Sequence, residues 1–248
     1  MIEDGIRTGL ENTCKDAINF CGSFTTKVSP EYLITVNISQ AIGNTNYSPG
    51  EPFLIRPEEP TRRFVDRCVE SIKWNNIFET IIRTGRLNTT RKGYLDIAIY
   101  NAKTSNPLTA IEVKLVSPDY KRFHRDIIRL MELLHLHDEK HGLSKIKRAY
   151  FACIEIDCTV KFPSQVDEHL DIVWRKYTRW LTEVFDSDDK TDFEVNVVSI
   201  EASLLLTDQI KTDDEITNAD LYSQARHCAG VIIVLKRKLK PLTANSDE

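Results

Sequence analysis

The sequence predicts an α/β protein in which helices flank a central mixed β-sheet. In some segments apolar residues recur at three- and four-residue steps, as on one face of a helix, and in others β-branched and aromatic residues form short runs between turn formers. Residues 2–21 show the helical pattern. Residues 93–100 and 108–116 show the strand pattern, and the turn-rich stretch 101–107 joins them. The alternation of the two patterns along the chain favours the α/β class.

The elements between these segments follow from local signals. A helix is predicted at 29–42, because Ser29 can act as the N-cap, Pro30 fits the first turn and Glu31 complements the helix dipole. The proline and glycine residues of 43–60 predict a loop.

The remaining elements are predicted on the same grounds. They are a helix at 61–74 capped by Thr61, a strand at 78–83, a helix at 117–137, a strand at 147–156, a helix at 164–185, a strand at 193–206, a loop or short helix at 207–222 and a strand at 230–235. In the helix at 117–137, Asp126 and Arg129 are spaced to pair across one turn. We expect a single α/β domain with a core at about 29–160, a short N-terminal elaboration and a C-terminal elaboration at about 161–248.

Composition limits the functional classes. The chain has 248 residues, of which 41% are hydrophobic and 28% charged, enough for one large domain. No stretch approaches the roughly 18 consecutive apolar residues of a membrane helix, and the start lacks the pattern of a signal peptide. A cytoplasmic protein with no membrane partner is therefore expected. The six cysteines are scattered without a Cys-x-x-Cys pair, which favours neither a zinc site nor a disulfide framework.

Three charged residues lie inside the two apolar strands. Asp96 belongs to the first strand, and Glu112 and Lys114 belong to the second. Side chains alternate faces along a strand, so Glu112 and Lys114 share a face, and Asp96 can join them if the strands pair antiparallel. Burial of an unpaired charge is costly, so such residues must be paired, bound to metal or directed into a cleft.

Two carboxylates and an ammonium group in one place favour a metal site with hydrolytic chemistry. Carboxylate oxygens suit Mg²⁺ or Mn²⁺, and Mg²⁺ is usually held by one or two carboxylates together with water and substrate phosphate oxygens. The lysine can neutralise developing charge or orient the attacking water. Phosphodiester cleavage is the reaction that these groups predict.

At these residues the chain resembles the PD-(D/E)xK nuclease superfamily, which has the restriction-endonuclease-like fold. The resemblance rests on Asp96, Glu112 and Lys114 in a strand, connection, strand frame that a long helix follows, and it covers roughly residues 29–160. Leu95 stands where the family name has proline, a position that varies in the family.

The resemblance implies a role for each of these residues. Asp96, Glu112 and the backbone carbonyl of Val113 would bind Mg²⁺ or Mn²⁺, and Glu31 of the preceding helix would aid through water or a second ion. Lys114 would position the attacking water and stabilise the charge of the transition state. DNA is favoured over RNA as the substrate because most of the family acts on DNA.

The charge distribution agrees with a nucleic-acid partner. Between Arg83 and Arg125, nine basic residues face three acidic ones, a net charge of +6, whereas the whole chain is at −4. A polyanion that docks through phosphate contacts would require such a basic stretch. The candidates for phosphate contacts are Arg91, Lys92, Lys121, Arg122 and Arg125.

The sequence thus predicts a Mg²⁺-dependent endonuclease or exonuclease, compatible with restriction or defence against foreign DNA in a prokaryotic cell and with a homodimer or a partner defence protein. Other interpretations stay open. Glu112 and Lys114 could form an ordinary ion pair on a solvated face, Asp96 could close a turn, and the basic stretch could be a solvated surface. The chain could also be a catalytically silent subunit that binds nucleic acid or a partner, or a regulatory protein that dimerises through its acidic C-terminal region.

Overall fold

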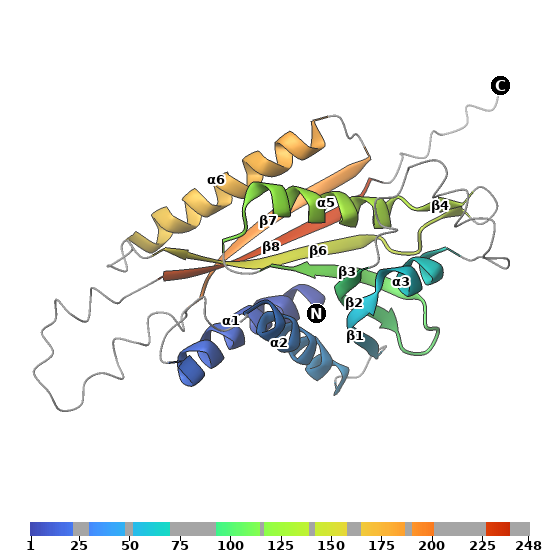
Figure 1. Cartoon of the computed structure of the whole chain (residues 1–248), viewed down its shortest axis with the longest axis horizontal. Helices are drawn as coiled ribbons and strands as arrows, with labels where there is room; N and C mark the ends of the chain where they lie inside the picture. The colour runs from blue at the N-terminus through green and yellow to red at the C-terminus, as the bar shows by residue number, and fades with distance from the viewer. Residues whose placement is uncertain are drawn as a thin grey trace, which may run out of the picture.

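Six strands form one mixed sheet in the order β1-β2-β3-β6-β8-β7, with helices on both faces (Figure 1). The computed structural model describes residues 1–21, 30–47, 52–69, 93–114, 117–138, 142–157, 165–186, 190–200 and 227–238. The strands are β1 (Phe53–Pro60), β2 (Tyr94–Asn101), β3 (Pro107–Val113), β6 (Arg148–Asp157), β7 (Thr191–Ile200) and β8 (His227–Arg237). Neighbouring strands pair antiparallel except β3 and β6, which run parallel. The predicted α/β class with a mixed sheet is confirmed.

The helices form a layer on each side of this sheet. Those described are α1 (Ile2–Cys21), α2 (Pro30–Asn44), α3 (Thr61–Cys68), α5 (Tyr120–Leu134) and α6 (Val166–Phe185). In Figure 1, α1 and α2 lie below the sheet, and α5 and α6 lie above it. A 3₁₀ turn at Thr45–Tyr47 follows α2, and a small sheet of β4 (His137–Asp138) and β5 (Gly142–Leu143) follows α5.

None of the described helices combines the length and the apolar composition that a membrane span needs.

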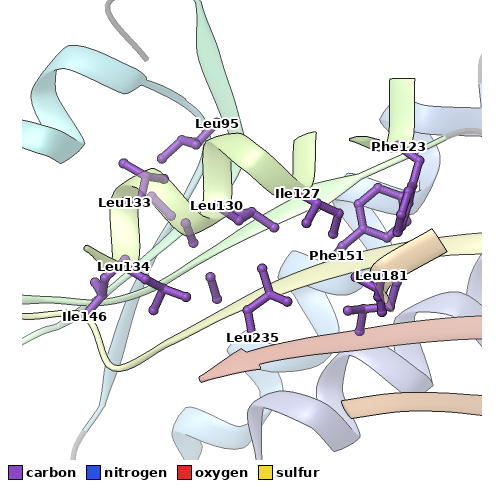
Figure 2. Close-up of a cluster of buried hydrophobic side chains, with 14 of the residues drawn as sticks. Leu95, Phe123, Ile127, Leu130, Leu133, Leu134, Ile146, Phe151, Leu181 and Leu235 are labelled. Carbon is purple, nitrogen blue, oxygen red and sulfur yellow. The ribbon is translucent and has the colours of Figure 1, made fainter. Parts of the chain in front are cut away.

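Each face of the sheet has its own hydrophobic core. On the α5 and α6 side, leucine, isoleucine and aromatic side chains such as Ile127, Phe123, Phe151 and Leu181 pack together (Figure 2). The rings of Phe123 and Phe151 meet edge to face with centroids 5.2 Å apart. On the other side, aliphatic residues of α1 and α2 pack against the odd-numbered positions of β2 and β3, namely Ile97, Ile99, Ile111 and Val113.

Helix α5 provides the crossover between the parallel strands β3 and β6. Parallel neighbours cannot be joined by a tight turn, so the chain leaves the sheet and returns through a helix. The Asp119 side chain accepts a hydrogen bond from the Arg122 backbone N–H at 2.8 Å and caps this helix. Its apolar stripe, which includes Ile127, Leu130 and Leu134, is fully buried. The stripe fixes which α5 residues face the end of β3.

The loop predicted at 43–60 is wrong. Residues 43 and 44 complete α2, and β1 spans Phe53–Pro60 at the edge of the sheet, where it pairs antiparallel with β2. Pro57, Pro60 and two adjacent glutamates gave this segment the composition of a loop. An edge strand tolerates proline because one side of its backbone needs no partner in the sheet.

Other boundaries differ from prediction. Helix α3 ends at Cys68, because Val69 has extended backbone angles, and Pro60 rather than Thr61 stands at its N-cap position. Strand β8 is longer than the predicted 230–235, since it pairs along its length between β6 and β7. The strand at 78–83, the segment 207–222, Ser29 and residues 201–206 lie outside the described residues.

Candidate active site

The ends of β2, β3 and α2 and the middle of α5 meet around the side chain of Lys114. The register of β2 and β3 pairs Ile97 with Ile111, as the predicted antiparallel arrangement requires. Because Ile111 and Val113 face α1 and α2, Glu112 points to the opposite face, which α5 covers. Glu112 is 1% exposed and Lys114 is 13% exposed, so the alternative of an ion pair on a solvated face is wrong.

The Lys114 ammonium lies in a cage of oxygens. It donates to Glu31 Oε1 at 2.9 Å and to the Val113 carbonyl at 3.0 Å. Asp126 Oδ2 and Asp96 Oδ2 lie 3.6 Å and 3.9 Å from Nζ. Burial opposes the charge of Lys114, but Asp96 and Asp126 outweigh it and raise its pKa to about 12. Lys114 is therefore a permanent cation at neutral pH.

Asp96 lies at the junction of the two strands. Its Oδ2 accepts a hydrogen bond from the Val113 backbone N–H at 2.6 Å, which fixes the carboxylate beside the end of β3. Burial raises the pKa of Asp96, and the Lys114 ammonium opposes this rise. The hydrogen bond from the Val113 backbone thus holds the Asp96 carboxylate in place. Asp96 lies within β2 and does not close a turn.

Glu112 is the most buried carboxylate of the site, and it pairs with Arg129 of α5. Arg129 also donates to the Tyr94 carbonyl at 2.8 Å. Burial and the nearby Asp96 raise the pKa of Glu112 well above its usual range, and Arg129 opposes them.

Asp126 and Arg129 belong to the site, although sequence reasoning did not include them in it. The expected pair between them is replaced by crossed pairs, since Arg129 donates to Glu112 and Asp126 faces Lys114. The sequence did contain a signal for them, since they are two charged residues three positions apart in the helix that follows the strand of Glu112 and Lys114. Glu58 of β1 also interacts with the site: burial raises its pKa, and the charges of Asp96 and Glu31 raise it further. Its segment had been predicted as a loop.

The site holds more negative than positive charge. Glu31, Asp96, Glu112 and Asp126 contribute four carboxylates, against the two cationic groups of Lys114 and Arg129, which leaves −2 when all are ionised. At the rim, Glu58 and Arg125 add one charge of each sign. An excess of buried negative charge is unfavourable unless a further cation compensates it or a carboxyl group takes up a proton, which the raised pKa values of Asp96, Glu112 and Asp126 favour.

The donor atoms are all hard oxygens. Carboxylates and a backbone carbonyl are the ligands that Mg²⁺ and Mn²⁺ prefer, so the chemistry of the set fits such an ion. Within the described residues, however, no three Asp, Glu, His or Cys side chains are grouped so that they could hold a metal ion as they stand. The Lys114 ammonium donates to the oxygens of Glu31 and Val113, and Arg129 pairs with Glu112.

The predicted phosphate contacts lie in two parts of the chain. Lys121, Arg122 and Arg125 are exposed on the first two turns of α5, where Arg122 pairs with Asp119 at 3.3 Å. Arg91 and Lys92 lie outside the described residues.

Comparison of the chain with protein-family models, with curated proteins and with solved structures gave no match. A functional assignment therefore depends on the site itself.

Proposed function

We propose that this protein is a metal-dependent nuclease that hydrolyses phosphodiester bonds in DNA, on a core of the restriction-endonuclease-like kind. One observation carries the proposal. Three carboxylates from different elements, Glu31, Asp96 and Asp126, surround a buried lysine, with the carboxylate of Glu112 beside them. The surplus of negative charge is the electrostatic environment that a divalent cation neutralises.

The chain order supports the same proposal. In chain order α2 precedes the antiparallel strands β1, β2 and β3, with α3 between β1 and β2, and the crossover helix α5 leads to the parallel strand β6. From β2 onward this order is the one that the resemblance at Asp96, Glu112 and Lys114 implies, whereas its first strand was expected at 78–83, outside the described residues, and not at β1.

The residues take distinct parts in the reaction. Asp96, Glu112 and the Val113 carbonyl would hold Mg²⁺ or Mn²⁺, with Glu31 in support. When bound, the ion lowers the pKa of a coordinated water from about 15.7 toward 7 and supplies hydroxide near neutral pH. Lys114, charged at any physiological pH, donates to the attacking water or to a phosphate oxygen. Lys121, Arg122 and Arg125 lie on the same helix as Asp126 and offer positive charge to the DNA backbone.

A cleavage assay tests the proposal. The purified chain is incubated with supercoiled plasmid, linear duplex, single-stranded DNA and RNA in Mg²⁺ or Mn²⁺, with and without EDTA. We expect DNA cleavage that EDTA abolishes and that Asp96→Ala and Lys114→Ala reduce by at least about a hundredfold. Cleavage at the wild-type rate in these variants would show that the site is elsewhere.

A second function is favoured by the contacts of Glu112. Its pairing with Arg129, and the lack of a ready metal cluster among the described residues, suit a catalytically silent subunit that binds nucleic acid. In that case no substrate is cut with either metal, and DNA is retarded in a gel with an affinity that falls steeply as salt rises.

A further inference from the structure

A buried carboxylate on α5 faces the Lys114 ammonium from outside the strand motif. The side chain of Asp126 is 4% exposed. Its Oδ2 lies 3.6 Å from Lys114 Nζ and accepts no closer hydrogen bond from the described residues, and its Oδ1 lies 3.7 Å from Arg125 Nε. A buried carboxylate oxygen without a hydrogen bond is unfavourable, so this placement needs a reason.

The acceptors around Lys114 come from several elements. Glu31 Oε1 of α2 lies at 2.9 Å, the Val113 carbonyl of β3 at 3.0 Å and Asp96 Oδ2 of β2 at 3.9 Å. The proposed function assigns the same oxygens to a divalent cation. An ammonium group and a divalent cation repel each other and need the same donors, so they compete for this cage. A further acceptor, Asp126 Oδ2 at 3.6 Å, comes from α5.

The geometry of α5 keeps Asp126 in reach of Lys114. Asp126 and Arg129 are three residues apart and share a helix face, while Glu112 and Lys114 are two apart and share a face at the end of β3. The helix pair therefore opposes the strand pair, with Arg129 against Glu112 and Asp126 against Lys114. Ile127 and Leu130, buried in the core beside them, hold the helix in this rotation.

We propose that Asp126 is a positioning residue for Lys114. It attracts the ammonium group to the α5 side of the site and so leaves the oxygens of Glu31, Asp96 and Val113 for the divalent cation. This inference rests on the proposed function, because it presumes that a cation uses these oxygens. Asp126 acts through Lys114 and is not itself a ligand of the cation.

A double-mutant cycle on Mn²⁺ affinity tests this role without any measurement of cleavage. Mn²⁺ binding to the full chain is followed by electron paramagnetic resonance for wild type, Asp126→Asn, Lys114→Met and the double variant. Asp126→Asn should weaken Mn²⁺ binding by about threefold or more, since Lys114 then competes more strongly for the cage. Lys114→Met should tighten binding, and Asp126→Asn should have no further effect in that background.

Three other results would overturn the inference. An equal loss of affinity from Asp126→Asn in both backgrounds would make Asp126 a ligand, and no loss in the wild-type background would leave it without this role. Absence of Mn²⁺ binding by the wild type overturns it as well. If Mn²⁺ binds and the cycle holds but no nucleic acid is cut, the nuclease proposal fails while the positioning role stands.

Asp119→Asn is the matched control for folding and charge. Asp119 is an exposed acid that caps the same helix, and asparagine caps a helix as well as aspartate does. This variant removes one negative charge from α5 at a position that faces Arg122. It should leave Mn²⁺ affinity and the melting temperature unchanged.

Discussion

Arg129 is the cation that favours the ionised form of Glu112 inside the protein. Glu112 is fully buried, its pKa is raised well above the usual range by burial and by Asp96, and Arg129 opposes that rise. Arg129 remains one-quarter exposed, so the pair spans from the interior to the surface. Loss of the arginine would leave a buried carboxyl group that is stable only in its protonated form.

Arg129→Met should therefore destabilise the protein in a pH-dependent way. A carboxyl group whose folded pKa lies above its unfolded pKa favours folding below the unfolded value, and this stability is lost as pH rises through the folded value. The deficit against wild type should appear as pH rises through the folded pKa of Glu112, which is already raised in the wild type, and reach on the order of 2 kcal/mol, less than the roughly 3 to 5 kcal/mol for breaking a fully buried pair.

Denaturant unfolding at several pH values measures this deficit, and Arg122→Met, an exposed arginine of the same helix, is its control. A deficit that is the same at pH 5 and pH 8 would contradict the role of Arg129 as the counterion of Glu112.

The sequence was sufficient to bring Asp96, Glu112 and Lys114 together, because strand periodicity fixes the side of a sheet on which a residue lies. Its helix-start signals placed Glu31 in the first turn of a helix, and only the family resemblance assigned that residue to the site. The sequence could not assign Arg129 to Glu112 and Asp126 to Lys114. Those contacts depend on the rotation of α5 over the sheet, which follows from core packing rather than from spacing along the chain.

Among the elements, α1 and α2 pack unusually closely. A Cβ atom at Gly9 would lie 2.6 Å from the Ile38 backbone nitrogen, and one at Gly5 would lie 3.1 Å from Ile42 Cα. Both contacts involve backbone atoms, which cannot move aside as a flexible side chain does. The two glycines thus let α2, which carries Glu31, lie directly against α1.

Gly9→Ala should force the two helices apart. The expected loss in the free energy of unfolding is about 1 to 3 kcal/mol, the range for overpacking, even though alanine is the better helix former. Thermal unfolding measures the loss. Gly43→Ala is the matched control, because a Cβ there meets only the Ile55 side chain at 3.6 Å among the described residues, so that variant should be neutral or slightly stabilising. Equal stability of both alanine variants would contradict the close helix contact.

The elements that the sequence predicted well are long and strongly periodic, such as α1, α5, α6 and β6. Strand β1 could not be recognised, because its prolines and glutamates are typical of loops and its pairing with β2 is a tertiary effect. The sequence could not predict the glycine contacts either, since nothing in the spacing of Gly5 and Gly9 identifies the helix against which they pack.

At the scale of the whole molecule, β8 lies inside the sheet, between β6 and β7. At its start, His227 Nδ1 lies 2.6 Å from His169 Nδ1 of α6, and His227 Nε2 lies 3.0 Å from Ser199 Oγ of β7. Two such nitrogens can share one proton but cannot both be protonated. Burial and His169 lower the pKa of His227 to about 4, although Asp157 opposes them.

This contact should make the fold sensitive to acid. A histidine whose pKa is lower in the folded state than in the unfolded state contributes stability above pH 6.5, and that stability is lost as pH falls toward 4. The loss from His227 is on the order of 3 kcal/mol, at about 1.4 kcal/mol per pKa unit. His227→Gln should flatten the decline in unfolding free energy between pH 7 and pH 4, while His124→Gln, at an exposed position, should not. A decline as steep in His227→Gln as in wild type would exclude this role.

The central claim is that the carboxylates around Lys114 bind a divalent cation for catalysis. The most direct test is the stoichiometry and affinity of Mn²⁺ binding, measured by electron paramagnetic resonance on the wild-type chain and on Asp96→Asn, which removes a charge but keeps the acceptor for the Val113 N–H. The site predicts saturable binding of Mn²⁺ that Asp96→Asn weakens by at least about tenfold. Binding of equal strength in both proteins, or none in either, would contradict it.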